Sequence, residues 1–476
     1  MGLISEVFGY SERTHQMKTK SRTRMRGDRL WPRISRLLLT VAFAGSLMCA
    51  HPNAQQGEES FVRWTKSHAI QLQTVELGSD INDMRQLKAI IGNARVVSLG
   101  EPAHGAHEPL AFRNRLFRYL VEESGFTAIA IEGGLPESRP IYDLVAGGPG
   151  DTGQIVRANL SCGGGESQEN EELIRWIREY NAKATSPRKV RFYAIDVGRC
   201  GQGTPLAAEN ALNYLSRVDP VSGQRLRAAF QPFLDRLSAS DEPSLSQAES
   251  DKLSATIEDL LALLERERPA FIAATSETDY QWAHRNAMAA RQAHRQYRVR
   301  PTEPPGAGIP PSAWRPSSQR DAAMADNVRW VLEREGPAGR ILVFAHNAHI
   351  KNSSTEGGIW NAFERPPTVM GQHLRSALGA DLVIIGMSSA QNGAGLPAAS
   401  LEAGSLDAAL SRVGMPLFLI DLRAARSDRA VAAWLTERRA LRANFTTFLT
   451  VSPNAAFDAL LFVDTLTPAR HAPDSR

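Results

Sequence analysis

The sequence predicts an α/β fold, built as a mostly parallel sheet flanked by helices, with an inserted helical subdomain. Short apolar runs rich in Val, Ile and Leu alternate with stretches in which apolar residues recur at helical spacing. This alternation favours parallel strands joined by helices. Between residues 206 and 299 the strands stop, and long helical periods rich in Ala, Leu, Glu and Arg predict the insert.

The strands and helices can be placed in order along the chain. Helical spacing in residues 61–91 precedes the first strand, and the helix that follows that strand stops at Gly125. Because a helix joins the first two strands, we expect them to be parallel and adjacent. The predicted strands are 95–99, 127–131, 190–195, 340–345, 381–385, 416–420 and 459–463, with the main helices at 110–121 and 170–182.

These patterns divide the chain into five parts. We assign residues 1–54 to an export leader, 61–205 to the first part of an α/β catalytic core, 206–300 to the helical insert, 301–317 to a Pro-rich linker and 318–466 to the second part of the core. The insert leaves the core at a strand end, so we expect it to cap the crevice above the sheet. A dimerisation element has the same pattern.

Composition indicates a globular protein that does not bind nucleic acid. The chain has 476 residues, 42% of them hydrophobic, which suits two or three domains with a sizeable core. Its formal charge is +4, but residues 1–36 carry nine Lys and Arg against three Asp and Glu. The rest of the chain therefore has a formal charge of −2, which excludes a basic surface for nucleic acid.

The N-terminal segment predicts export to the periplasm or secretion. Six arginines between residues 22 and 36 precede the twelve-residue apolar run 37–48, which has the length of a signal-peptide core and is too short to span a bilayer. Lipid attachment at Cys49 is less favoured, because the residues before it match a lipoprotein signal poorly. Once the leader is removed, we expect no stable membrane span. Cys162 and Cys200 then remain, either bridged or as two free thiols.

The segment from residue 96 to residue 108 carries the densest acid–base potential in the chain. An apolar run ends at Gly100, and Glu101 and His104 follow before a helical pattern begins. In a parallel sheet, the turn after a strand faces the crevice where ligands bind. Other predicted strands end in the same way, at Glu132, at Asp196, and at His346 with His349.

The combination of these motifs resembles the erythromycin esterase family, which includes proteins of succinoglycan biosynthesis. The likeness covers about Trp64 to Asp464. It implies an α/β fold with a helical insert, and a hydrolase that opens a macrolide lactone with activated water, His104 being the general base. It also implies that Glu101, Arg113, Glu132, His346 and His349 line the cleft. The matching residues are Gly100–Gly105, Glu108, Arg113, Ala130–Glu132, Arg320, Asp321, Met324, Asn327 and Ala345–His349.

The same chemistry follows from the residue types themselves. An imidazole is largely neutral near pH 7 and can take a proton from water, so His104 suits a general base. Glu101 or Glu132 would hold its tautomer, and Arg113, His346 or His349 would stabilise the oxyanion. No Gly-x-Ser-x-Gly motif occurs, which favours direct attack by water on a small-molecule ester without a required cofactor.

Other interpretations stay open. His104, Glu101, Glu132, His346 and His349 are also suitable N and O ligands for a divalent metal, as in a metallohydrolase or a metal-binding protein without turnover. A third reading is an envelope enzyme that modifies polysaccharide with the same site. A structural ion pair between Glu101 and Arg113 is the alternative to their place in the site. Asp321 and Asn327 are expected to stabilise a helix–sheet junction. We expect His107, His284, His294 and His373 to be in solvent or satisfied locally.

Overall fold

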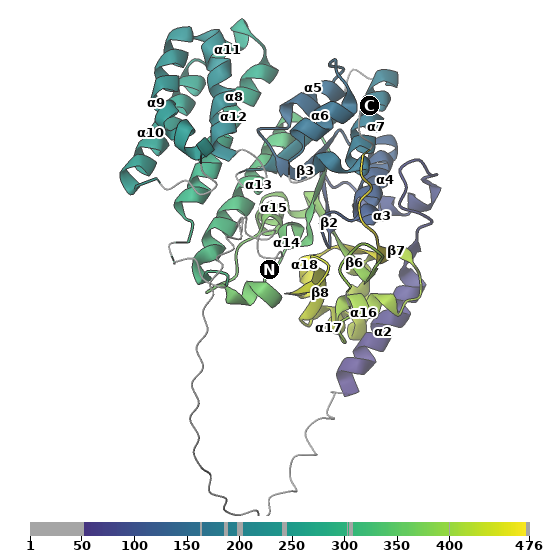
Figure 1. The fold of residues 1–476 in the computed structure, drawn as a ribbon. Helices are drawn as coiled ribbons and strands as arrows, with labels where there is room; N and C mark the ends of the chain where they lie inside the picture. The colour runs from purple at the N-terminus through teal and green to yellow at the C-terminus, as the bar shows by residue number, and fades with distance from the viewer. Residues whose placement is uncertain are drawn as a thin grey trace, which may run out of the picture. The chain divides into compact units, whose positions relative to one another are not determined.

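The computed structural model describes residues 52–161, 164–184, 189–197, 203–239, 245–301, 303, 308–398 and 400–472 (Figure 1). The described residues from Gly57 onward make up one compact unit. Nearly all of the predicted leader, with Cys49, and both Cys162 and Cys200 lie outside the described residues. Export, lipid attachment and the disulfide therefore stay predictions.

Eight strands form one sheet in the order β1-β7-β10-β6-β2-β5-β3-β4. From β10 to β4 all neighbours are parallel, and only β7 runs against its two neighbours, β10 and β1. The predicted mostly parallel sheet is thus confirmed. The strands are β1 (Ile70–Gln71), β2 (Val96–Glu101), β3 (Ala128–Gly134), β4 (Arg191–Asp196), β5 (Ile341–His346), β6 (Leu382–Asn392), β7 (Leu417–Asp421) and β10 (Ala459–Leu466).

The predicted adjacency of the first two strands is wrong. β5 lies between β2 and β3, with Glu101 opposite His346 on one side and Ile131 opposite Phe344 on the other. Every residue of β5 is buried. A strand of this kind is stable only with a partner on each edge, so it takes a central place although it begins 207 residues after the end of β3. All three strands run in the same direction, so their carboxyl ends still meet at one edge.

Helices cover both faces of the sheet (Figure 1). On one face lie α4 (His107–Ser124) and α7 (Gln168–Lys183), and Phe117 of α4 shares a buried cluster with Leu99 and Phe344. On the other face lie α13 (Trp314–Arg334), α14 (Asn347–Ile350) and α15 (Met370–Leu378). α14 approaches β2 so closely that any side chain at Gly100 would collide with Asn347. Glycine is therefore required where the strand meets the site.

The remaining elements surround this core. α4 ends where predicted, because Gly125 adopts the left-handed conformation (φ +67°) that closes a helix. The sequence patterns did not predict the two-stranded hairpin of β8 (Arg439–Ala443) and β9 (Thr447–Val451). The other helices are α2 (Pro52–His68), α3 (Leu87–Ile91), α5 (Arg139–Val145), α6 (Thr152–Asn159), α16 (Leu406–Ser411), α17 (Arg429–Thr436) and α18 (Pro453–Ala456).

The predicted insert consists of five helices that pack together beside α13 (Figure 1). Ser246 begins one of them with a capping box that it forms with Glu249. The insert leaves the core after β4 and returns to it through α13. Its role as a cap stays a prediction. The five helices are α8 (Gly203–Val218), α9 (Pro220–Ala239), α10 (Gln247–Arg266), α11 (Arg268–Ala274) and α12 (Glu277–Arg298).

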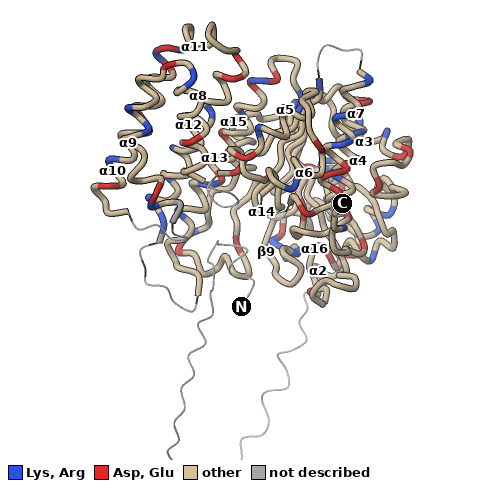
Figure 2. The backbone as a smooth tube through the Cα atoms, turned by 45° about the horizontal axis from the view of Figure 1, so that its top comes forward, with Lys and Arg blue, Asp and Glu red and all other residues tan. Residues whose placement is uncertain are grey.

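Charge is mixed over the described surface. Figure 2 shows basic and acidic positions interspersed along the helices and loops, without a region of one sign. This distribution gives no indication of nucleic-acid binding. None of the described helices combines the length and the apolarity that a bilayer crossing needs.

Candidate active site

The turn after β2 holds His104 by one nitrogen. Nδ1 of the imidazole lies 2.6 Å from Oε1 of Glu101, the last residue of the strand. The His104 side chain is 53% exposed and that of Glu101 only 6%. Nε2 of His104 has no hydrogen-bond partner among the described residues. The buried carboxylate thus orients the ring and leaves its second nitrogen available.

The surroundings of His104 favour its protonated form. Desolvation lowers the pKa of the imidazole, but the negative charge and hydrogen bond of Glu101, together with the charge of Glu132, outweigh it and raise the pKa to about 9. The same contacts stabilise the imidazolium that forms when the ring takes a proton. His104 is therefore a strong base in the small fraction of molecules that carry it neutral at pH 7.

A buried network lies beside this pair at the ends of β3 and β4. Arg320 of α13 donates from Nη2 to Glu132 at 2.7 Å and makes a two-pronged contact with Asp196, with Nε at 3.0 Å and Nη2 at 2.7 Å. Burial alone would lower the pKa of Arg320, but Asp196 and Glu132 raise it above its ordinary value. Arg320 stays charged and joins the two strand ends.

His349 extends the network to α14. Its Nδ1 lies 2.8 Å from Asp321, and its Nε2 lies 3.0 Å from Nη1 of Arg320 and 3.4 Å from Glu132. Burial tends to raise the pKa of Glu132, but the charges of His349 and Arg320 hold it well below its ordinary value. Glu132 is thus a carboxylate, and it also accepts from the backbone N–H of His346 at 2.9 Å.

His346 is held on both nitrogens by backbone. Nδ1 accepts from the N–H of Ala348 at 3.1 Å, and Nε2 donates to the carbonyl of Pro102 at 3.2 Å. Burial and the nearby charge of His104 lower the pKa of His346 to about 3. The ring is neutral and both of its nitrogens are engaged. It therefore anchors the turn that carries His104.

The predicted place of Arg113 beside the imidazoles is not seen. Its guanidinium donates to the side chains of Asn114 and Asn170 and lies 4.9 Å from the centre of the Phe344 ring. Within the described residues Arg113 makes no ion pair, so the alternative of a structural pair with Glu101 is wrong as well. The physical reason is direction: Arg113 points from α4 into the layer between α4 and α7, where amide oxygens satisfy it.

The cation beside the imidazoles is Arg320, which was not predicted to take part in the chemistry. Arg320 and Asp321 belong to the motifs that resemble the family. However, α13 follows the linker, and the sequence does not show which of its residues face the sheet. Asp321, expected to be structural, accepts from His349 of α14 and from the backbone N–H of Met370, the first residue of α15, both at 2.8 Å. Asn327 does join α13 to the sheet, donating to the carbonyl of Ile195 at 2.6 Å.

The predicted metal ligands do not converge on a common point. Within the described ranges no three His, Cys, Asp or Glu side chains are arranged to hold a metal ion. The nitrogens of His346 face backbone groups, and Glu132 is engaged by Arg320 and by a backbone N–H. The residues therefore fit a network of direct hydrogen bonds better than a coordination shell.

A known family model matches the part of the chain that contains most of this site. The model of the family described as erythromycin esterase matches residues 121–466, more than half of the chain. The chain belongs to the erythromycin esterase family. The match contains Glu132, Arg320, His346 and His349, while His104 lies before its first residue.

Proteins similar to this member of the erythromycin esterase family span most of the chain. An erythromycin esterase type II of Escherichia coli is 26% identical over 341 residues, covering 69% of this chain and 77% of that protein. The putative hydrolase YbfO of Bacillus subtilis (strain 168) is 22% identical over 458 residues, covering 93% and 99%. A crystal structure of a Bacillus cereus protein shares the fold, with TM-score 0.73 and 24% identity over 87% of this chain and 99% of that one. Membership of this family supports a hydrolase.

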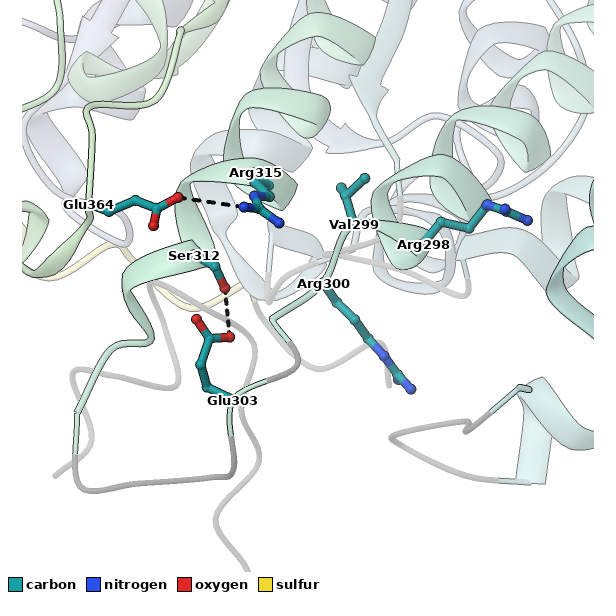
Figure 3. Close-up of a pocket in the computed structure, with 7 residues that line it drawn as sticks. All are labelled: Arg298, Val299, Arg300, Glu303, Ser312, Arg315 and Glu364. Atoms are coloured by element: carbon teal, nitrogen blue, oxygen red, sulfur yellow. Dashed lines mark hydrogen bonds and ion pairs between the residues drawn. The ribbon is translucent and has the colours of Figure 1, made fainter. Parts of the chain in front are cut away.

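A separate hollow of about 350 Å³ lies at the start of α13 (Figure 3). Figure 3 shows Ser312 joined to Glu303 and Arg315 joined to Glu364, while Arg298 and Arg300 point away from these pairs. None of the predicted site residues lines this hollow. It therefore does not belong to the cluster around His104.

Proposed function

We propose that this protein hydrolyses an ester bond of a small molecule, with His104 as the general base that activates water. One observation carries the proposal. Glu101 holds Nδ1 of His104 at 2.6 Å, while Nε2 is without a partner among the described residues and the side chain is half exposed. A base needs such an arrangement, because one nitrogen must be oriented and the other must reach the reacting water.

The step follows from this geometry. Nε2 of His104 takes a proton from water as the water oxygen bonds to the ester carbonyl carbon, and Glu101 stabilises the imidazolium. The tetrahedral intermediate then breaks its bond to the alkoxy group, which receives the proton from His104. The products are a carboxylic acid and an alcohol, so no electrons or further groups are needed.

The buried network supplies a fixed frame for this step. Glu132, Asp196 and Arg320 keep the ends of β3, β4 and α13 together, and His349 with Asp321 ties α14 to them. Because these charges are already paired, they do not need to reorganise when charge develops on the substrate. We assign them to positioning of the site rather than to proton transfer.

We propose two classes of substrate. Family membership makes a macrolide lactone one member of the test set, and an acylated sugar is the second, since a solved structure with TM-score 0.71 and 23% identity over 87% of this chain and 98% of that one is called a succinoglycan biosynthesis protein. Both are esters that the proposed step can cleave. We also propose export, on the basis of the leader; fractionation of cells should recover the protein outside the cytoplasm.

Turnover of an ester panel tests the proposal. For His104→Ala we expect a loss of about 10²- to 10⁴-fold in rate, the usual share of general-base catalysis. The matched control is His284→Ala in the insert, where the imidazole pairs with the exposed Glu265 and stacks on the ring of Tyr280; its rate should equal that of the wild type. Circular dichroism checks the fold of both. Unchanged turnover in His104→Ala would rule out the assignment.

A further inference from the structure

The C-terminal segment Thr467–Ala472, called the strap here, runs between the turn of His104 and the start of α7. On one side, the N–H of His107 donates to Thr467 and the N–H of Ala469 donates to Gly105, both at 2.8 Å. On the other side, the N–H of Gln168 donates to Arg470 and that of Ala472 to Glu166, also at 2.8 Å. The strap thus pairs with both segments and joins them.

Glu169 of α7 holds the strap through hydrogen bonds from Arg470. Its side chain is fully buried, and one oxygen accepts from the backbone N–H and from Nε of Arg470, both at 3.0 Å. Ser167 donates to the other oxygen at 2.6 Å. Arg470 also donates to Glu172 at 2.9 Å. A buried carboxylate with these donors fixes the strap at one residue.

His107 connects the same carboxylate to the turn. It is the first residue of α4, three positions after His104, and its ring lies 2.7 Å from Glu169 through Nδ1 and 2.9 Å from Glu76 through Nε2. The turn itself has no regular structure between Pro102 and Gly105. External contacts must therefore hold its backbone, and two of them, at Gly105 and His107, come from the strap.

We propose that Arg470 and Glu169 are positioning residues, which hold the strap so that the turn keeps His104 on Glu101. The inference rests on the proposed role of His104 as the base. Without the Arg470–Glu169 contact, the strap loses its buried side-chain anchor at that end, and the hydrogen bond from Ala469 to the carbonyl of Gly105 is weakened. The turn then samples conformations in which Nδ1 of His104 is away from the carboxylate, and Nε2 is no longer directed at the substrate.

Arg470→Ala tests this inference, with Arg175→Ala as the matched control. Arg175 is a half-exposed residue of α7, and its ion pair with Glu171 does not touch the strap. For Arg470→Ala we expect kcat to fall by about 10- to 100-fold with KM unchanged, the size of effect that misplacement of a reacting group produces. The control should keep the wild-type kcat.

The second readout is the titration of the His104 imidazole by NMR in the full chain. Loss of the contact with Glu101 should lower its pKa by at least about one unit in Arg470→Ala and leave it unchanged in Arg175→Ala. This measurement needs no substrate, so it tests the strap even when no ester in the panel is cleaved. A lower melting temperature with unchanged kcat and unchanged titration shows a merely structural strap and overturns the inference.

A milder variant covers the case in which Arg470→Ala does not fold. Thr467→Val removes only the hydroxyl that donates to Glu108 at 2.7 Å, at the other end of the strap. We expect the same direction of change, a lower kcat and a lower pKa of His104, with a smaller amplitude. Wild-type values for both in a folded Thr467→Val protein would overturn the inference.

Discussion

The rings of His104 and His346 lie 5.2 Å apart, and their surroundings favour opposite protonation states. Burial and the charge of His104 lower the pKa of His346 to about 3, while Glu101 and Glu132 outweigh desolvation and raise that of His104 to about 9. Two imidazoles with such different pKa values have different roles in the site. His346 stays neutral and holds Pro102, and His104 is the one that can exchange a proton.

The pH profile follows from this difference. Only neutral His104 accepts a proton, so kcat/KM should rise about tenfold per pH unit from pH 6 and level off near pH 9. Glu101→Gln removes the charge that raises the pKa, so the plateau of the variant should begin at a lower pH and at a lower rate. Rates measured from pH 5 to pH 10 check both. A profile that is flat from pH 6 to pH 9 contradicts the role of His104.

The fold was largely predictable because local patterns specify its elements. The continuous apolar runs of β2, β3 and β5 predict buried strands, and Gly125 predicts the end of α4. The order of strands was not predictable in the same way. The place of β5 between β2 and β3 depends on which pairs bury most surface, which no local pattern states. The hairpin β8–β9 was missed because Asn444 and Phe445 at its turn, both with positive φ, lack the glycine that usually marks such a turn.

The site was predictable where strand ends carry it and not where a helix face does. Glu101 and His346 end β2 and β5, and Glu132 lies two residues before the end of neighbouring β3, so the shared edge brings them together. Arg113 and Arg320 both lie on helices, and a helix can turn any face to the sheet. The sequence therefore could not decide which arginine reaches the imidazoles. It is Arg320 that does so.

Arg320→Met should destabilise the protein strongly. The variant leaves the carboxylates of Asp196 and Glu132 buried without their cation, and breaking a buried ion pair in this way costs about 3–5 kcal/mol. Urea unfolding measures the change. The control is Arg315→Met on the same helix, whose ion pair with Glu364 is exposed and 3.7 Å long; there we expect a change within about 0.5 kcal/mol. Equal losses in the two variants contradict the role of Arg320.

The lowered pKa of Glu169 predicts that the protein loses stability in acid. Burial raises its pKa, but hydrogen bonds from His107 and Ser167 outweigh this and lower it to about 2. A carboxyl whose pKa is lower in the folded state stabilises the fold above its ordinary pKa, and this contribution is lost as the pH falls through about 2. The free energy of unfolding should therefore decline from about pH 4.5 downwards. In Glu169→Gln the decline over the same range should be shallower; an equal slope shows that other groups cause it.

The pKa of His107 is shifted in the opposite direction from that of Glu169. The same experiment therefore separates the contributions of the two residues to stability. The hydrogen bond to Glu169 outweighs desolvation and raises the pKa of His107 above 6.5. Its contribution to stability is therefore complete below about pH 6.5 and is lost as the pH rises through the raised pKa. His107→Gln should flatten the decline of unfolding free energy on the alkaline side and leave the acid side to Glu169. An unchanged alkaline slope contradicts the contact.

Removal of metal ions should leave turnover unchanged. Nε2 of His104 could bind an ion, but His349, His346 and Glu132 could join it only by giving up contacts that are already formed: Nδ1 of His349 to Asp321 at 2.8 Å, Nε2 of His346 to Pro102 at 3.2 Å, and Glu132 to Arg320 at 2.7 Å. Each displaced partner would be left buried and unsatisfied, which opposes binding. The protein is dialysed against a chelator, analysed for bound elements and assayed on the ester that it cleaves best, with circular dichroism as the check on folding. Turnover that disappears on dialysis and returns with one equivalent of zinc or manganese shows that the metal-dependent interpretation is correct, and that water is activated by an ion and not by His104.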